Sequence, residues 1–162
     1  MPDVRFYRAT KSDAEVLAKD MRAADVREVE RTGQTPRQAL LTSLKQSDVA
    51  FTARFDGHIA FMFGVGPAFP PNTLLGSVDV GWAWLLTGNR CNQSPRSFLR
   101  HREWCMRMLL EKYPTILSFV DAEYKGALRL VRRLGFKQGD EVEFQPGYPF
   151  VTIHIRRDTW AQ

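Results

Sequence analysis

The chain has 162 residues, of which 44% are hydrophobic and 25% are charged. This size and composition fit one globular domain and exclude a disordered, collagen-like or coiled-coil protein. No apolar run approaches the roughly 20 residues of a membrane span. The two cysteines give neither a disulfide framework nor a zinc site. Because the N-terminal residues also lack the layout of a signal peptide, we expect a cytoplasmic protein without a membrane partner.

The net charge of +5 lies in the second half of the chain. Residues 90–133 hold 10 Lys or Arg against 4 Asp or Glu. A concentrated positive field favours an anionic partner, such as a phosphorylated cofactor, nucleic acid or an acidic protein surface. The alternative is that these side chains only form solvated helix faces. Because no aromatic platform accompanies the arginines, we do not expect nucleic acid to be the partner.

The first quarter of the chain predicts one strand followed by helices. A short strand over residues 4–8 precedes Ser12–Glu15, which has the spacing of a capping box. The helix that opens there is expected to continue, with a break, as far as Gly33. Thr35–Gln38 is a second capping signature, with proline at the first helical position.

The period of the apolar pattern then changes and predicts an antiparallel meander. Apolar residues alternate over residues 49–55, and Asp56-Gly57 is a signal for a tight hairpin turn. The continuous apolar run over residues 59–65 predicts a strand that is covered on both faces. A third strand is expected over residues 77–86, where apolar residues alternate again.

The second half of the chain adds two helices and three strands. Ser94-Pro95 predicts a helix start, and Gly135-Phe136 predicts a helix end. The expected elements are a helix over 95–113, a strand over 116–120, a helix over 124–134, and strands over 141–144 and 150–155. The sequence therefore predicts a single α+β domain over residues 1–162, with a mixed, mostly antiparallel sheet of six or seven strands and about four helices.

Two segments carry a resemblance to a known family. Residues 127–136, Ala-Leu-Arg-Leu-Val-Arg-Arg-Leu-Gly-Phe, resemble the fourth-helix ending A-x-x-x-Y-x-x-x-G-F of the GCN5-related N-acetyltransferase (GNAT) family. Residues 49–86 resemble the central meander of that family, and the element order is similar over residues 4–155. A narrower likeness, to small GNAT-like proteins of the T7 group of tailed phages, rests on residues 25–29, 63–65, 84–86 and 134–136.

The resemblance implies an acyltransferase that uses acetyl-CoA. In the family, acetyl-CoA lies where the fourth and fifth strands splay apart, with its pantetheine on the fourth strand and its pyrophosphate on amides at the next helix N-terminus. By position, residues 85–87 would face pantetheine, and residues 88–94 with Arg96 would hold the pyrophosphate. The implied cofactor-binding residues are Leu85, Leu86, Thr87, Gly88, Asn89, Arg90, Asn92, Gln93, Ser94 and Arg96.

The sequence departs from the family's pattern at two places. The family's phosphate loop, Q/R-x-x-G-x-G/A, is replaced over residues 87–95 by Thr-Gly-Asn-Arg-Cys-Asn-Gln-Ser-Pro. The family's tyrosine, which commonly protonates the departing thiolate, aligns with Val131. These departures give an alternative function, a phage-type protein that has lost its chemistry and binds a host bacterial protein or serves in the virion. If exposed strands of two copies of the chain pair, the protein would be a homodimer.

Acetyl transfer to an amine needs a base for the amine and an acid for the thiolate. Asp79, on the third meander strand, is the predicted base, and the alternative is a capping or pairing role at the solvent face. Glu123 borders the implied cleft, and Tyr124 is the tyrosine near the family's acid position. Trp82 and Trp84 share one strand face and are expected in the core. The three histidines have neither metal-site nor triad spacing.

Overall fold

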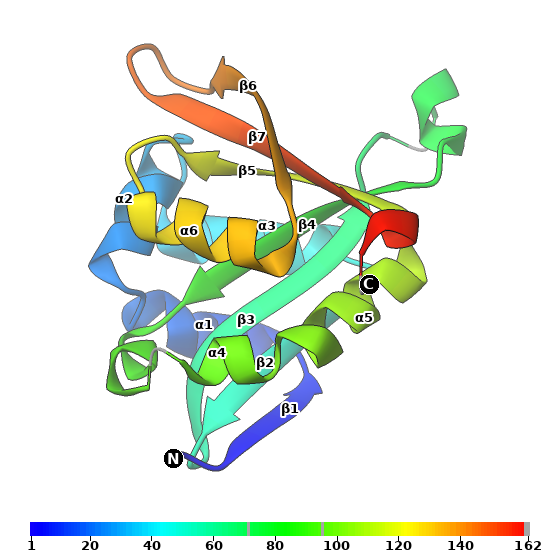
Figure 1. Ribbon diagram of the computed structural model, residues 1–162. Coiled ribbons are helices and arrows are strands. Elements are labelled where there is room, and N and C mark those ends of the chain that lie inside the picture. The colour runs from blue at the N-terminus through cyan, green and yellow to red at the C-terminus, as the bar shows by residue number, and fades with distance from the viewer. Residues whose placement is uncertain (71, 95, 161–162) are drawn as a thin grey trace.

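The computed structural model describes residues 1–70, 72–94 and 96–160, which form a seven-stranded sheet and six α-helices. The strands are β1 (Val4–Arg8), β2 (Val49–Phe55), β3 (His58–Pro67), β4 (Val80–Thr87), β5 (Thr115–Asp121), β6 (Lys137–Glu143) and β7 (Pro149–Arg156). The α-helices are α1 (Lys11–Lys19), α2 (Ala23–Glu30), α3 (Pro36–Gln46), α4 (Ser97–Arg100), α5 (Arg102–Lys112) and α6 (Lys125–Leu134). The sheet order is β1-β2-β3-β4-β5-β7-β6, and neighbouring strands are antiparallel except β4 and β5 (Figure 1). The predicted α+β class is confirmed.

Helices cover both faces of the sheet (Figure 1). On one face α1 and α3 pack around Leu17, Leu40 and Met62, and on the other face α5 and α6 pack around Phe61. Adjacent residues of a strand point to opposite faces, so Phe61 and Met62 enter different cores. The expectation that residues 59–65 are covered on both sides is therefore confirmed.

Local signals for turns and helix ends are confirmed. Asp56 and Gly57 have φ of 50° and 83°, the positive values that a tight hairpin turn requires. Thr35 and Gln38 form the predicted capping box at the start of α3. Gly135 ends α6 with φ of 103°, in the left-handed region that favours glycine.

The capping box predicted at Ser12–Glu15 is wrong by two residues. The Thr10 hydroxyl accepts from the Asp13 N–H at 3.1 Å, and the Asp13 carboxylate accepts from the Thr10 N–H at 3.2 Å. Asp13 also accepts from Thr52 at 2.9 Å and from Arg54 at 3.2 Å. These bonds to β2 favour Thr10 over Ser12 as the cap, and they join residues far apart in the sequence.

The single helix predicted over residues 95–113 is also wrong. The chain forms α4 and α5, which meet at His101. The His101 ring packs edge-on against Phe6 of β1, with 5.6 Å between ring centroids, so a contact with the first strand accompanies the break. The predicted first residue of this helix, Pro95, lies outside the described residues.

Two strand boundaries differ from the prediction. The strand predicted over residues 77–86 begins at Val80, because a 3-10 turn occupies Leu74–Ser77. The strand predicted over residues 141–144 begins at Lys137, and every residue of β6 is exposed. An exposed edge strand has no apolar alternation, which is why its start gave no signal in the sequence.

β4 and β5 separate along their length. They pair in parallel at three positions, Val80 with Thr115, Gly81 with Ile116 and Trp82 with Leu117. Beyond these pairs β4 continues to Thr87 beside β3, and β5 continues to Asp121 beside β7. In the described part of the chain no further pair joins the two strands, which leaves a gap in the middle of the sheet.

Candidate active site

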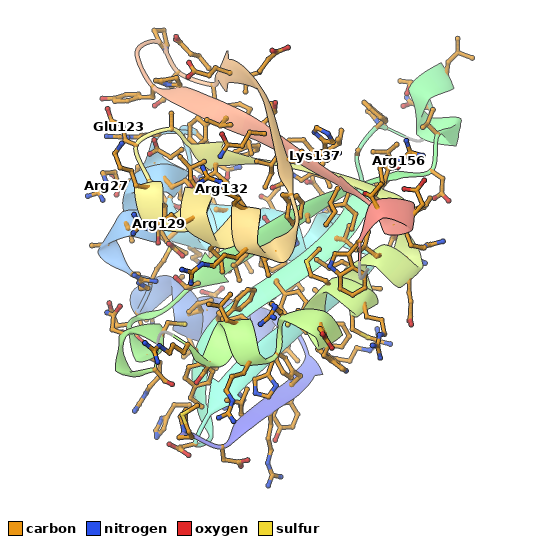
Figure 2. The ribbon with its side chains drawn as sticks, in the orientation of Figure 1. Arg27, Glu123, Arg129, Arg132, Lys137 and Arg156 are labelled. Atoms are coloured by element: carbon orange, nitrogen blue, oxygen red, sulfur yellow. The ribbon has the colours of Figure 1, made fainter. Side chains whose placement is uncertain are left out.

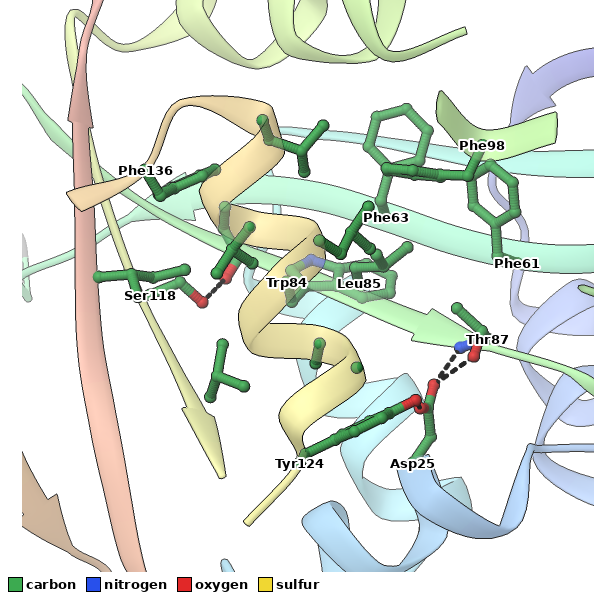
Figure 3. A pocket seen from close by; sticks show the side chains of 18 of the residues that line it. Asp25, Phe61, Phe63, Trp84, Leu85, Thr87, Phe98, Ser118, Tyr124 and Phe136 are labelled. Atoms are coloured by element: carbon green, nitrogen blue, oxygen red, sulfur yellow. Dashed lines mark hydrogen bonds between the residues drawn. The ribbon is translucent and has the colours of Figure 1, made fainter. Parts of the chain in front are cut away.

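A cavity of about 360 Å³ lies at the gap between β4 and β5 (Figure 3). It is bounded by α6 on one side and by α4 and α5 on the other. Apolar side chains such as Phe63, Phe98 and Leu130 form most of its wall. Its polar lining includes Asp25 and Tyr124. A mostly apolar cavity with a few convergent polar groups has the character of a ligand site.

The backbone of β4 faces the gap at every second residue. The Gly88 N–H donates to the Ala60 carbonyl at 2.7 Å, so Gly88 faces β3. Because N–H and C=O groups alternate in direction along a strand, Ala83, Leu85 and Thr87 face the gap instead. These three residues also line the cavity.

Side chains already occupy two of these three positions. The Ala83 carbonyl accepts from the Ser118 hydroxyl of β5 at 2.7 Å. The Thr87 N–H donates to the Asp25 carboxylate at 2.5 Å. Between them, the N–H and C=O of Leu85 point into the gap with no strand beside them. Leu85 therefore offers one donor and one acceptor to a ligand in the cavity.

Asp25 organises the polar end of the cavity (Figure 3). It is 4% exposed, and it accepts from the Thr87 N–H, from the Thr87 hydroxyl at 2.6 Å and from the Tyr124 hydroxyl at 2.8 Å. Burial, and next the negative charge of Asp25, raise the pKa of Tyr124. Tyr124 therefore keeps its proton at neutral pH and donates it in the hydrogen bond to Asp25.

Glu28, one turn after Asp25 on α2, is a second carboxyl group in the cavity wall. Burial raises its pKa to about 8, against the opposing effect of the hydrogen bond from the Asp121 N–H at 3.0 Å. Asp121 itself is 3% exposed, and both its oxygens accept from Arg31, at 3.0 and 2.8 Å. With its pKa of about 8, Glu28 is able to exchange a proton near neutral pH.

The predicted catalytic residues lie in three different places. Tyr124 lines the cavity. Asp79 is exposed, precedes the first residue of β4 and therefore lies at the opposite end of that strand from the gap. The Glu123 side chain is 71% exposed and forms an ion pair with Arg31 at 2.9 Å. The structure brings neither Asp79 nor Glu123 into the lining of the cavity among the described residues.

The predicted pantetheine residues divide between two faces. Leu85 and Thr87 line the cavity, as their position on the open edge requires. Leu86 points the other way and packs with Leu17 in the core under α1 and α3. Only the alternate residues of β4 are therefore available to a ligand in the gap.

The amides expected to form a phosphate cradle over residues 88–94 are in part bonded within the protein. Residues 89–93 form a 3-10 helix, whose turns use some of the N–H groups of this segment. Amides of five residues donate to carbonyl groups of the protein at 2.7 to 3.3 Å, namely those of Gly88, Asn89, Cys91, Ser94 and Ser97. The predicted phosphate-side residues that are described but do not line the cavity are Gly88, Asn89, Arg90, Asn92, Ser94 and Arg96. The Gln93 side chain lies outside the described part of the structure.

The sequence analysis missed Arg22, Asp25 and Glu28, all at or on α2. The available signal was the position of Asp25, which shares the buried face of the helix with Val29 four residues later. A carboxylate on an apolar helix face has to find partners. Those partners come from β4 and α6, which no pattern within residues 23–30 indicates.

Other kinds of chemistry find no support in the described residues. No group of three or more His, Cys, Asp or Glu side chains there could hold a metal ion. Cys91 lines the cavity, but burial raises the pKa of its thiol to about 12, which disfavours the nucleophilic thiolate. None of the helices described combines the length and apolar character of a membrane span.

Several solved structures with the same fold are named as acetyltransferases. An N-acetyltransferase from Staphylococcus aureus Mu50 has 13% identity and a TM-score of 0.70, over 96% of this chain and 99% of that one. The aminoglycoside acetyltransferase AAC(6')-Ib in complex with coenzyme A has 17% identity and a TM-score of 0.69, over 96% of each chain. A ribosomal-protein-alanine N-acetyltransferase from Brucella melitensis has 13% identity and a TM-score of 0.63, over 94% of this chain and 99% of that one. No protein-family model matches the sequence, and no curated protein matches it. The chain therefore has the N-acetyltransferase fold.

Proposed function

We propose that the chain is an N-acyltransferase that moves an acetyl group from acetyl-CoA to an amine. The observation that carries this proposal is the gap between β4 and β5 with the unpaired backbone of Leu85 at its edge. The amide groups of a pantetheine chain need one donor and one acceptor at such an edge, and apolar walls suit its methylene groups. Acetyl-CoA supplies the thioester that makes the acetyl group reactive.

Three side chains of the cavity have roles in this proposal. Glu28 accepts a proton from the attacking amine in its ionised form, which its pKa of about 8 makes available as the pH rises toward 8. As the new C–N bond forms and the C–S bond breaks, the Tyr124 hydroxyl gives up its hydrogen bond to Asp25 and donates that proton to the sulfur. Asp25 holds the Tyr124 hydroxyl in place at 2.8 Å. Asp79 and Glu123 have no part, because neither lines the cavity.

The acceptor amine is proposed to enter from the other face of the sheet. A second cavity of about 400 Å³ lies beside α3, and Trp82 forms part of its wall. Trp84 and Phe119 border both cavities. Trp82 and Trp84 are only partly buried, and this position gives them a role beyond the core packing expected from the sequence.

A second candidate function is a catalytically inactive protein of the phage type that binds a host bacterial protein. Two features favour it, the valine at position 131 and the internal hydrogen bonds of the amides over residues 88–97. In this case the cavity would have lost its cofactor. A stoichiometric partner recovered from bacterial lysate, together with no binding of acetyl-CoA, would support it.

Titration with acetyl-CoA separates the two functions. We expect calorimetry to detect binding, and we expect stability to rise by about 2.7 kcal/mol at a hundredfold excess over the dissociation constant. Ala127→Trp fills the cavity and should abolish binding, whereas Arg132→Trp, on the exposed face of the same helix, should not. Absence of any effect on the natural protein at millimolar acetyl-CoA would refute the enzyme proposal.

A further inference from the structure

Three arginines line the cavity that contains the open edge of β4. Arg129 and Arg133 lie four residues apart on α6 and therefore on the same side of that helix. Arg22 precedes α2 and lines the cavity as well. Figure 2 marks Arg129 and Arg132 on α6, and Arg132 is outside the lining.

None of the lining arginines has a carboxylate partner within the described residues. The ion pairs there involve Arg5, Arg31, Arg37, Arg54 and Arg156. Arg129 and Arg133 are exposed on their outer side and line the cavity. Guanidinium groups without a carboxylate are able to bind a phosphate, and their planar donors suit two of its oxygens at once.

The segment after β4 explains why a phosphorylated ligand would need arginine side chains in this cavity. Five backbone amides of the described residues in this segment, those of Gly88, Asn89, Cys91, Ser94 and Ser97, donate to carbonyl groups of the protein, so fewer amides remain to hold a pyrophosphate. A ligand that carries phosphate groups must therefore find most of its positive partners elsewhere around the cavity. Arg129 and Arg133 of α6 are those partners by position and charge.

We propose that Arg129 and Arg133 bind the phosphate groups of the acyl carrier in place of backbone amides. The proposal rests on the proposed function, because it takes the acyl carrier to be a phosphorylated pantetheine such as coenzyme A. It assigns the positive charge of α6 to the ligand rather than to a solvated helix face.

The test compares ligands with and without phosphate. Calorimetry measures the affinity of coenzyme A, 4′-phosphopantetheine and pantetheine for the natural protein and for the double variant Arg129→Ala, Arg133→Ala. The matched control is Lys125→Ala, Arg132→Ala, which removes the same charge from exposed positions of α6 that do not line the cavity. We expect the test variant to lose about tenfold or more in affinity for coenzyme A and to bind pantetheine unchanged, with the control near the natural protein.

Comparison of the three ligands also identifies which phosphate groups the arginines bind. Loss of affinity for 4′-phosphopantetheine as well as coenzyme A would assign the arginines to the phosphate nearest pantetheine, and loss for coenzyme A alone would assign them to the nucleotide end. Equal losses in the test and control variants, or an equal loss for pantetheine, would overturn the proposal while leaving the acyltransferase intact. If the natural protein binds none of the three ligands, the proposed function itself fails.

Discussion

Replacing Glu28 with glutamine should remove a pH dependence from the stability of the protein. The folded carboxyl has a pKa of about 8, because burial disfavours its charged form, against 4.5 for an ordinary glutamate. Between these values the folded state holds a proton that the unfolded state has released. The contribution of this proton to stability is therefore fully present below about pH 4.5. The free energy of unfolding then falls as the pH rises toward 8.

The size of the effect follows from the difference in pKa. A shift from 4.5 to about 8 corresponds to roughly 5 kcal/mol. Because the Glu28 side chain is partly open to the cavity, we expect the loss of stability between pH 5 and 8 to be about 3 kcal/mol. Glutamine keeps a carbonyl oxygen for the Asp121 N–H, so the variant should fold and show a flat profile over this range.

Urea unfolding at several values of pH between 5 and 9 measures the difference directly. Glu30→Gln is the matched control, since it makes the same change on the exposed side of α2. The control should follow the natural protein at every pH. If the difference between the natural protein and Glu28→Gln does not change with pH, the carboxyl titrates normally and its role as proton acceptor loses its basis.

Three further changes test the cavity and its surroundings. Asp25→Ala leaves three donors without their acceptor, and urea unfolding should show a loss of about 3 kcal/mol, whereas a loss below about 1 kcal/mol would contradict the network. Leu85→Pro removes an N–H that faces the gap and bonds to no strand, so the variant should keep its circular dichroism spectrum and bind acetyl-CoA about tenfold more weakly. The control Leu86→Pro removes an N–H that bonds to β3, and this variant should unfold. Gly64→Ala would place a methyl group 2.7 Å from the Val49 carbonyl, and thermal unfolding should show a loss of about 2 kcal/mol; an unchanged melting temperature would contradict the close approach.

Sequence reasoning succeeded where the signal was local. The turn at Asp56-Gly57 needs positive φ at two adjacent residues, and those residue types provide it without help from the rest of the fold. The meander could be predicted from the alternation of apolar and polar residues, because a few residues of sequence are enough to reveal a strand with one buried face. Gly135 ended α6 for the same reason, since its left-handed conformation is a property of one position.

The candidate site was only partly predictable because its contacts join distant segments. Asp25 meets Thr87, 62 residues later, and Tyr124, 99 residues later. Two of the five hydrogen bonds after β4 go to the carbonyls of Ala60 and Asp20, which are distant in the sequence. The family resemblance identified residues 85–87 together, and strand alternation then separates Leu85 and Thr87, which line the cavity, from Leu86, which does not. Nothing in the sequence indicates that α2, which supplies Asp25 and Glu28, lies beside β4.

The residue that donates the proton to the leaving sulfur determines where along α6 that sulfur must lie in the cavity. Tyr124 and Val131 both line it and are seven residues apart, or about 10 Å along α6. A proton donor at Tyr124 therefore places the leaving sulfur near Asp25, whereas the family's position would place it near Val131.

This difference predicts how three variants behave in an assay of thiol release from acetyl-CoA with a panel of amines. Tyr124→Phe should lower kcat by about a hundredfold with little change in acetyl-CoA affinity. Adding Val131→Tyr to that variant should restore no activity, because its hydroxyl would lie two turns from the sulfur. Val131→Phe controls for the added volume in the cavity. If the Tyr124→Phe, Val131→Tyr double variant regains the natural rate while the Tyr124→Phe, Val131→Phe variant does not, the sulfur lies at Val131 and Tyr124 only supports Asp25.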